Sequence, residues 1–316
     1  MKQHLLAIRL GCSAALLVVL SACGLSSAAP TLPSSAPAPA AAPQPPESAL
    51  LTQPPAGLTD TTAAVQVVLD YYHAIAQKHD DQAYGLWAEG GAASGQTLPQ
   101  FEQGYAKTAG LSVLLDRATV SGDAVTVPIT ILSVLNHSDQ TQQPQRFSGT
   151  YTLRQEGGGW RIASANVAQG DASAEPPAST GDALRVVQAY YQALDEGNYP
   201  RAYTYWENNG TASQQSYTVF VQGFASTDSV TLATGQARTN AAAGSAYTEV
   251  PVVVLGQQRD GSRQSFCGTY RLRRATVPPF DTFGWRIESA STLQTPNIEP
   301  GSDIVQQLLN GRCAAR

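Results

Sequence analysis

One pattern of aromatic, alanine and glycine residues occurs twice in the chain. Residues 70–87, DYYHAIAQKHDDQAYGLW, correspond to residues 189–206, AYYQALDEGNYPRAYTYW. The copies match again further along the chain, where RFSGTYTLR corresponds to SFCGTYRLR and GWRIASA corresponds to GWRIESA. Two copies are too few for a solenoid, which needs three or more stacked units. The sequence therefore predicts a duplication that gives two similar domains, each with a core of its own.

Each copy is predicted to form helices first and strands afterwards. Apolar residues fall at helical spacing in the first helix of each copy; they are Val65, Val68, Leu69, Tyr72 and Ile75, then Leu184, Val187, Tyr191 and Leu194. From residue 126 the period changes to two, with alternation over 126–131 and 147–154 and a turn at QEGGGW. Helices that precede an antiparallel sheet with one apolar face predict an α+β fold.

The first residues have the composition of a secretory signal. Lys2 and Arg9 precede a short apolar run, which is followed by small residues that end in Cys23. The run is too short to cross a ~30 Å hydrocarbon core as a helix. LSAC, residues 20–23, resembles the lipobox of bacterial lipoproteins, which implies that Cys23 is acylated, with palmitate as one such acyl group, and becomes the new N-terminus. A chance LSAC inside an ordinary signal peptide stays open as the alternative.

The resemblance implies a location in the bacterial cell envelope. Two or three acyl chains on Cys23 hold a protein to a membrane more stably than a single chain does. Gly24 follows the cysteine, where an Asp in Gram-negative lipoproteins resembles an inner-membrane retention signal. We therefore expect a lipid-anchored protein of the outer membrane, on its periplasmic or surface side, if the source is Gram-negative.

Composition divides the rest of the chain. Residues 24–58 carry nine prolines, no aromatic residue and one charged residue, Glu47, so they cannot bury a core and favour an extended tether. The predicted segments are a signal peptide (1–22), the lipidated cysteine and tether (23–58), a first domain (59–168), a linker (169–180), a second domain (181–295) and a C-terminal tail helix (296–316). The formal net charge of −5 gives no indication of nucleic-acid binding.

The two domains resemble the NTF2-like superfamily, which includes SnoaL-type and ketosteroid-isomerase-like proteins. The resemblance rests on YYxA, AYxxW, FxxG[YF]A and the closing F[SC]GTYxLR…GWRI hairpin, over residues 59–168 and 180–293. It implies two tandem cones, each with N-terminal helices packed on a curved antiparallel sheet. Family members include cyclases, isomerases, dehydratases, ligand-binding modules and interaction domains, so the resemblance alone does not decide the function.

The sequence predicts no catalytic residue, no metal site and no cofactor. The enzymatic relatives hold an Asp or a His–Asp pair inside the cone, because proton abstraction beside a carbonyl needs a base in a dry pocket. Strand alternation places no carboxylate clearly inward here. His73 and His79 are replaced by Gln192 and Asn198 in the second copy, and His137 falls in a loop. No nucleophile elbow, phosphate loop or metal-spaced His/Cys cluster is present.

Aromatic residues are the remaining candidates for a binding site. Ten of them are candidates for lining a pocket: Tyr72, Trp87, Tyr105, Tyr151, Trp160, Tyr191, Trp206, Phe224, Tyr270 and Trp285. The alternative is that these side chains are simply core. We expect a non-catalytic binding or scaffold module whose partner is a small hydrophobic ligand or an envelope protein. An inhibitor or partner module of an envelope enzyme and an isomerase- or cyclase-like enzyme are the two alternatives.

The last two cysteines, Cys267 and Cys313, are predicted to form a disulfide. Cys12 leaves with the signal peptide and Cys23 carries lipid, which leaves this pair in an oxidising compartment. Cys267 replaces Ser148 of the first copy, and only the second copy is followed by a tail, so cysteine and tail occur together. Alternation predicts that the tail helix, with a stripe of Ile304, Val305, Leu308 and Leu309 ended by Gly311, lies across the outer face of the second sheet.

Overall fold

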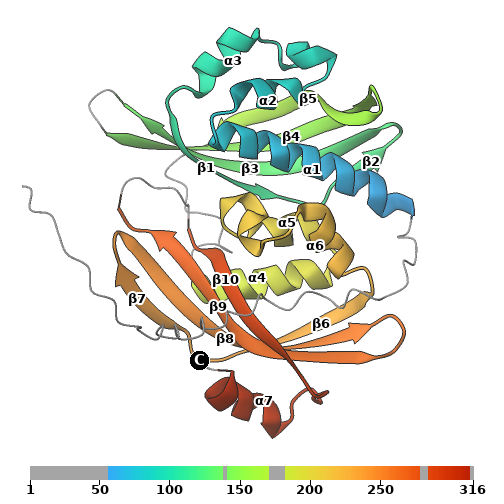
Figure 1. Ribbon diagram of the computed structural model, residues 1–316, viewed down its shortest axis with the longest axis vertical. Helices are drawn as coiled ribbons and strands as arrows, with labels where there is room; N and C mark the ends of the chain where they lie inside the picture. Colours follow the sequence, from blue (N-terminus) through green and yellow to red (C-terminus); the bar gives the residue numbers. More distant parts are fainter. Residues whose placement is uncertain (1–55, 138–140, 171–181, 278–283, 314–316) are drawn as a thin grey trace, which may run out of the picture. The chain divides into compact units, whose positions relative to one another are not determined.

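The computed structural model describes residues 56–137, 141–170, 182–277 and 284–313, which all belong to one compact unit (Figure 1). The predicted signal peptide, Cys23, nearly all of the tether and most of the 169–180 linker lie outside the described residues. Among the helices that are described, none combines the length and the apolar character needed to span a membrane.

The first half of the described chain has helices before strands, as predicted. Its elements are α1 (Ala56–Ala76), α2 (Asp80–Gly85), η1 (Glu89–Ser94), α3 (Leu98–Tyr105), β1 (Thr108–Leu115), β2 (Thr119–Ser121), β3 (Ala124–Asn136), β4 (Gln142–Glu156) and β5 (Gly159–Gly170). The strands form one antiparallel sheet in the order β1-β3-β4-β5, and β2 also pairs with β3. The β1 strand is therefore an edge of this sheet.

The second half has the same order of elements and the same sheet topology. Its elements are α4 (Ala183–Asp195), α5 (Tyr199–Thr204), η3 (Asn208–Ser213), α6 (Tyr217–Gly223), β6 (Thr227–Thr234), β7 (Arg238–Ala242), β8 (Ser245–Gln258), β9 (Arg263–Ala275) and β10 (Arg286–Thr295). The antiparallel order is β10-β9-β8-β6, and β7 pairs with β8. A tail follows, with α7 (Asp303–Gln307) and η4 (Leu308–Arg312).

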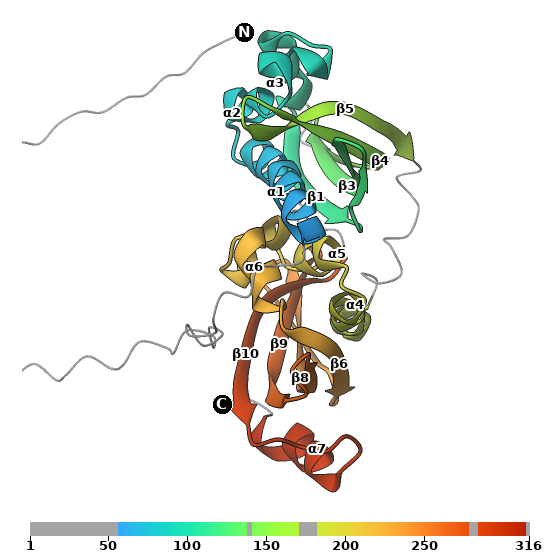
Figure 2. The same ribbon diagram turned by 90° about the vertical axis from the view of Figure 1, so that its right-hand side faces the viewer.

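Each long N-terminal helix packs on the sheet of its own half. The α1 helix contacts β1, β3, β4 and β5, and α4 contacts β6, β8 and β10 (Figures 1 and 2). The predicted stripe of α1 is the reason, since Val65, Val68 and Ile75 are completely buried. Burying each such side chain stabilises the fold by about 1.5–3 kcal/mol. The predicted α+β fold class, with two tandem cones of helices on a curved antiparallel sheet, is confirmed.

The glycine of the repeated GTY motif marks a close approach between two strands. A Cβ atom on Gly149 of β4 would lie 1.9 Å from the carbonyl oxygen of Asn166 on β5, and one on Gly268 of β9 would lie 2.0 Å from that of Ser291 on β10. Real Cβ atoms do not approach backbone this closely. Glycine is therefore required at this position in both copies.

The tail covers the outer face of the second sheet through a small separate core. Val305, Leu309 and Cys313 pack against Val253 and Cys267. The predicted Cys267–Cys313 disulfide is present, with Cα atoms 5.5 Å apart.

Two details of the predicted tail are wrong. Ile304 is 51% exposed, because only part of the apolar stripe faces the sheet. Gly311 does not end the helix, which continues as a π-type turn to Arg312, and the bond from Cys313 N–H to the Leu308 carbonyl closes it.

Candidate functional site

Paired tyrosines fill the interior of each cone. The hydroxyl groups of Tyr72 and Tyr151 lie 2.7 Å apart in the first half, and those of Tyr191 and Tyr270 lie 2.7 Å apart in the second. Burial raises the pKa of Tyr72 and of Tyr270 well above 10, so both stay neutral hydrogen-bonding groups. The centre of each cone is thus a packed core that is closed by its own side chains.

The ten aromatic residues predicted to line a pocket belong to this core. Eight are buried, namely Tyr72, Trp87, Tyr151, Trp160, Tyr191, Trp206, Tyr270 and Trp285, while Tyr105 and Phe224 are partly buried against them. Their rings pack at mutual tilts, as where Trp87 and Tyr151 meet edge to face with centroids 6.1 Å apart. The arrangement fits the alternative that the sequence left open, in which these side chains are core.

The described residues place no free acid or base inside a cone. Their only buried carboxylate is Glu207, and the Arg273 guanidinium lies 3.2 Å from its Oε1 atom, so this carboxylate is held in an ion pair. His79 and His137 are exposed, and His73 is partly buried on α1. No group of three or more side chains that could hold a metal ion occurs in the described part of the chain.

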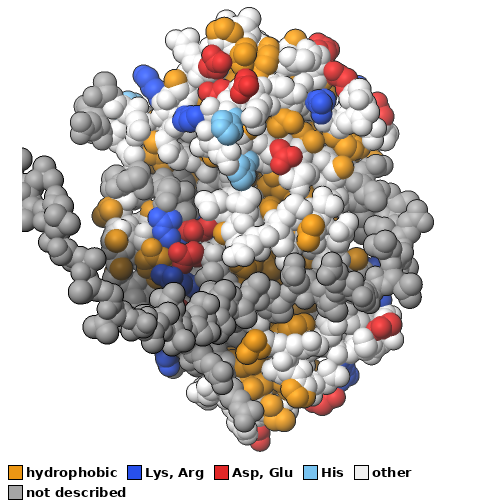
Figure 3. All heavy atoms as spheres, in the orientation of Figure 1, with side chains coloured by type: hydrophobic (Ala, Val, Ile, Leu, Met, Phe, Trp, Pro, Cys, Tyr) orange, Lys and Arg blue, Asp and Glu red, His pale blue; other side chains and the backbone are white. Residues whose placement is uncertain are grey.

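A polar cleft lies where α1 of the first half meets the segment from α5 to α6 of the second half. Its volume is about 360 Å³, within the range of small-molecule pockets. The walls are formed by Gln66, Leu69, Asp70, His73, Tyr203, Asn209, Thr211, Gln214, Gln215 and Ser216. In the view of Figure 3, histidine side chains lie next to an area coloured as backbone and other side chains. This cleft is the candidate functional site.

The α1 wall of the cleft carries an amide and a carboxylate one helical turn apart. Gln66 Nε2 donates a hydrogen bond of 2.8 Å to Asp70 Oδ1. Gln66 Oε1 is buried and accepts no hydrogen bond from any described residue. Partial desolvation raises the pKa of the Asp70 carboxyl, although the Gln66 hydrogen bond and the nearby His73 oppose the rise. The wall therefore presents the Asp70 carboxylate to the cleft, whereas the Gln66 Oε1 atom is buried.

The second wall contains non-glycine residues in a strained backbone conformation. Asn209 and Gln214 have φ angles of 56° and 60°, where the first copy has Gly90 and Gly95. Residues other than glycine rarely adopt this left-handed backbone region, and holding such a residue there costs of the order of 1 kcal/mol or more. The second copy thus has two amide side chains at the cleft, at positions where glycine would adopt the backbone conformation without strain.

Side chains of the second half fix the cleft by capping the edge of the first sheet. Asn209 Oδ1 accepts a hydrogen bond of 3.0 Å from Val113 N, and Thr204 Oγ1 accepts one of 3.1 Å from Leu115 N. The corresponding first-copy residues are glycines, so this contact is specific to the second copy. An edge strand covered in this way cannot pair with another chain.

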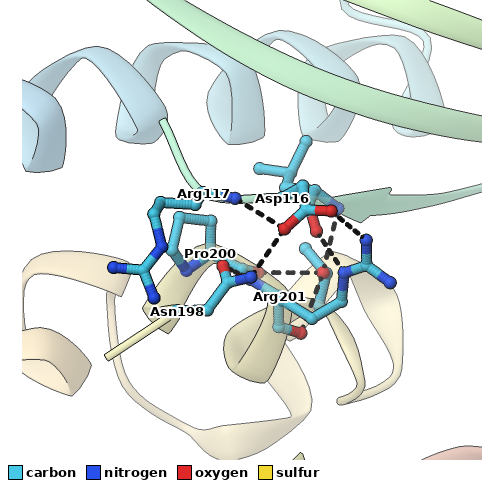
Figure 4. A network of polar contacts seen from close by, with 7 residues as sticks. Asp116, Arg117, Asn198, Pro200 and Arg201 are labelled. Atoms are coloured by element: carbon cyan, nitrogen blue, oxygen red, sulfur yellow. Dashed lines mark hydrogen bonds and ion pairs between the residues drawn. The ribbon is translucent and has the colours of Figure 1, made fainter. Parts of the chain in front are cut away.

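A charged network directly after β1 adds to the contact between the two halves (Figure 4). Arg201 forms an ion pair with Asp116 and donates from Nε to the Leu115 carbonyl at 2.8 Å. Asn198 Nδ2 donates to Asp116 Oδ1 at 2.6 Å. Burial raises the pKa of the Asp116 carboxyl, but hydrogen bonds from Asn198 and from Arg117 N–H and the charge of Arg201 outweigh this effect. The pKa of Asp116 is therefore lowered. The two halves are therefore joined by directional bonds.

Sequence reasoning missed this site because it searched for residues that the two copies share. The cleft contains positions at which the copies differ in sequence: Asp70 corresponds to Ala189, while Asn209 and Gln214 correspond to glycines. Polar residues that replace glycine or alanine in only one copy are the signal that could have found it.

Solved structures with a similar fold include NTF2-like proteins. A candidate dehydratase of the NTF2-like family from Streptomyces avermitilis shares 20% identity, with 36% of this chain and 98% of that chain covered and a TM-score of 0.29. An NTF2-like protein with a cystatin-like fold from Novosphingobium aromaticivorans shares 18% identity over 37% and 87% of the two chains, with a TM-score of 0.29. A Mycobacterium tuberculosis protein of unknown function shares 16% identity over 42% and 85%, with a TM-score of 0.30. No family model matches the chain, and no curated protein matches it significantly.

Proposed function

We propose that the chain is a non-catalytic binding module of the bacterial cell envelope, anchored by lipid on Cys23, and that the cleft between its two halves holds the ligand. One observation carries the proposal: the cones are filled with their own aromatic side chains, whereas the cleft is open and lined by polar groups from both copies. Binding sites are concave and combine a few convergent polar groups, as this cleft does. A polar ligand then replaces the small hydrophobic ligand that the aromatic residues suggested.

A non-catalytic role is supported by the chemistry of the cleft. A general base needs a pKa near the working pH and a partner that orients it. Asp70 is exposed and bonded to a neutral amide, and His73 Nε2 lies 2.5 Å from Nε2 of the exposed Gln77 side chain. Neither group is held as a base against an oxyanion donor. Binding accounts for the arrangement without a reaction step.

The ligand site is tested by comparing the full-length protein with a variant that fills the cleft. The side chain of Thr211 is exposed on the second wall, so Thr211→Trp should block the cleft without disturbing the core. Thr231→Trp, at an exposed position of β6, is the matched control. Each protein is incubated with envelope extract, and retained components are identified by mass spectrometry.

The outcomes separate the three function classes. A small polar component retained by the wild type and the control, but not by Thr211→Trp, supports the proposal. A protein retained by all three would support a partner module instead. A component that the wild type converts chemically would support an enzyme, and no component that depends on the cleft would reject the site.

The anchor is tested separately. Cys23→Ser removes the thiol that would carry lipid, so the variant should leave the membrane fraction or stay unprocessed. Membrane attachment equal to that of the wild type would contradict the lipobox.

A further inference from the structure

We infer that the cleft binds a saccharide that carries free hydroxyl groups and an amino group. This inference rests on the proposed function and deepens it, because it assigns a chemical class to the ligand of the same cleft. It follows from which hydrogen-bonding groups of the lining are already used and which are free to meet a ligand.

Charge excludes the commonest polar ligands. The lining contains the Asp70 carboxylate and the His73 imidazole, but no lysine or arginine. Phosphates and carboxylates are recognised by cations and by convergent backbone N–H groups, and a carboxylate in the wall repels them. The accessible surface of the lining is more apolar than polar, but the two large apolar side chains, Leu69 and Tyr203, are buried, so no deep apolar channel is offered to an acyl chain. The ligand is therefore polar and either neutral or positively charged.

The free valences of the lining are mixed donors and acceptors. Asn209 Oδ1 is occupied by Val113 N–H, which leaves the Asn209 Nδ2 group as a donor. Ser216 Oγ accepts from Val219 N–H, which leaves the Ser216 hydroxyl hydrogen. Thr211 Oγ1 donates to the Asn208 carbonyl, which leaves the Thr211 lone pairs. A sugar hydroxyl both donates and accepts, so a ring with adjacent hydroxyls matches such a set.

The α1 wall explains the amino group. The Asp70 carboxylate is exposed at the cleft, and no lysine or arginine of the lining lies there to neutralise it. The Asp70 carboxylate is 2.8 Å from the Gln66 amide on the same helix face. A ligand ammonium group can donate to the exposed Asp70 carboxylate and place a positive charge beside it.

A basic peptide is the competing ligand, and the shape of the cleft favours the sugar. Peptides bind to free strand edges, apolar grooves or exposed aromatic surfaces. The nearest edge strand, β1, is capped by Thr204 and Asn209, and the aromatic lining residue Tyr203 is buried with its hydroxyl donated to the Gln215 carbonyl at 2.7 Å. A free strand edge and an exposed aromatic surface are therefore both missing from the cleft.

The experiment titrates the full-length detergent-solubilised protein by calorimetry with three probes: a glucosamine tetramer, an N-acetylglucosamine tetramer and tetralysine. We expect both sugars to bind, with the glucosamine tetramer about two- to fivefold tighter at low salt, the range of one partly exposed ion pair. Asp70→Asn should remove that preference and leave the N-acetylated sugar unaffected. Asp123→Asn, in the exposed turn between β2 and β3, removes the same charge elsewhere and should change nothing.

The result also separates this inference from the proposal beneath it. Tetralysine binding as tightly as the glucosamine tetramer, or sugar binding that survives Thr211→Trp, overturns the sugar assignment. If neither sugar binds while a different small polar component is retained in a cleft-dependent way from envelope extract, only the ligand class is wrong. If nothing binds the cleft in either experiment, the proposed function fails as well.

Discussion

The buried hydroxyl of Thr204 should make a measurable contribution to the contact between the two halves. Thr204 is completely buried, and Thr204 Oγ1 accepts from Leu115 N at 3.1 Å while donating to the Pro200 carbonyl at 2.9 Å. Thr204→Val keeps the shape of the side chain but leaves the buried Leu115 N–H unpaired. An unpaired buried donor costs about 1–3 kcal/mol, so the free energy of unfolding should fall by about that amount. For a unit of this size, the melting temperature should fall by about 2–4 °C per kcal/mol.

The assay is guanidinium unfolding followed by tryptophan fluorescence, which samples both halves because each contains two of the four tryptophans. Thr231→Val, at an exposed position of β6, makes the same chemical change without a buried partner. Thr204→Ser keeps the acceptor, so it should lose less stability than Thr204→Val. Equal unfolding midpoints for Thr204→Val and Thr231→Val would refute the capping of β1 by Thr204.

Three further predictions follow from the described contacts. The lowered pKa of Asp116 means that its network contributes stability above the ordinary carboxyl value of about 3.9 and loses it as pH falls through the lower folded value, so Asp116→Asn should flatten the acid side of the melting-temperature profile below about pH 4. An unaltered acid profile would argue against the network. Gly149→Ala should destabilise the fold by about 1–3 kcal/mol, because its Cβ atom would lie 1.9 Å from the Asn166 carbonyl oxygen, whereas Gly104→Ala in α3 meets no atom within 4 Å and should be neutral or stabilising. Comparable thermal melts for these two variants would contradict the strand contact. Cys313→Ser should cost about 4 kcal/mol in the chain-entropy model for a separation of 46 residues, and mass spectrometry of the unreduced wild type should find neither Cys267 nor Cys313 open to alkylation.

The sequence by itself determined the architecture of each half. The apolar stripe of α1 and the alternation in β3 are local patterns, and a residue's position in such a pattern states which face meets its own sheet. Because the second copy repeats these patterns, the same architecture is predicted for both halves. The disulfide could also be predicted, because leaving out the cysteines of the predicted signal peptide and lipobox leaves only Cys267 and Cys313.

The same local patterns could not determine how the aromatic side chains are used. A Tyr or Trp on an inward position fits a pocket wall and a filled core equally well. The choice depends on whether rings from distant elements meet, as Tyr72 and Tyr151 do. Tertiary packing places these aromatic side chains in the core.

The contact between the halves was decided only by tertiary structure. Strand alternation puts Arg286 on the outward side between Trp285 and Ile287, yet it is 1% exposed, because the second half meets the first there and the Arg286 Nη2 atom lies 3.4 Å from Ser112 Oγ. This burial lowers the pKa of Arg286 to about 10. Periodicity records how a segment packs on its neighbours along the chain, whereas Arg286 and the cleft depend on groups that are far apart in sequence and become adjacent only when both cones have folded.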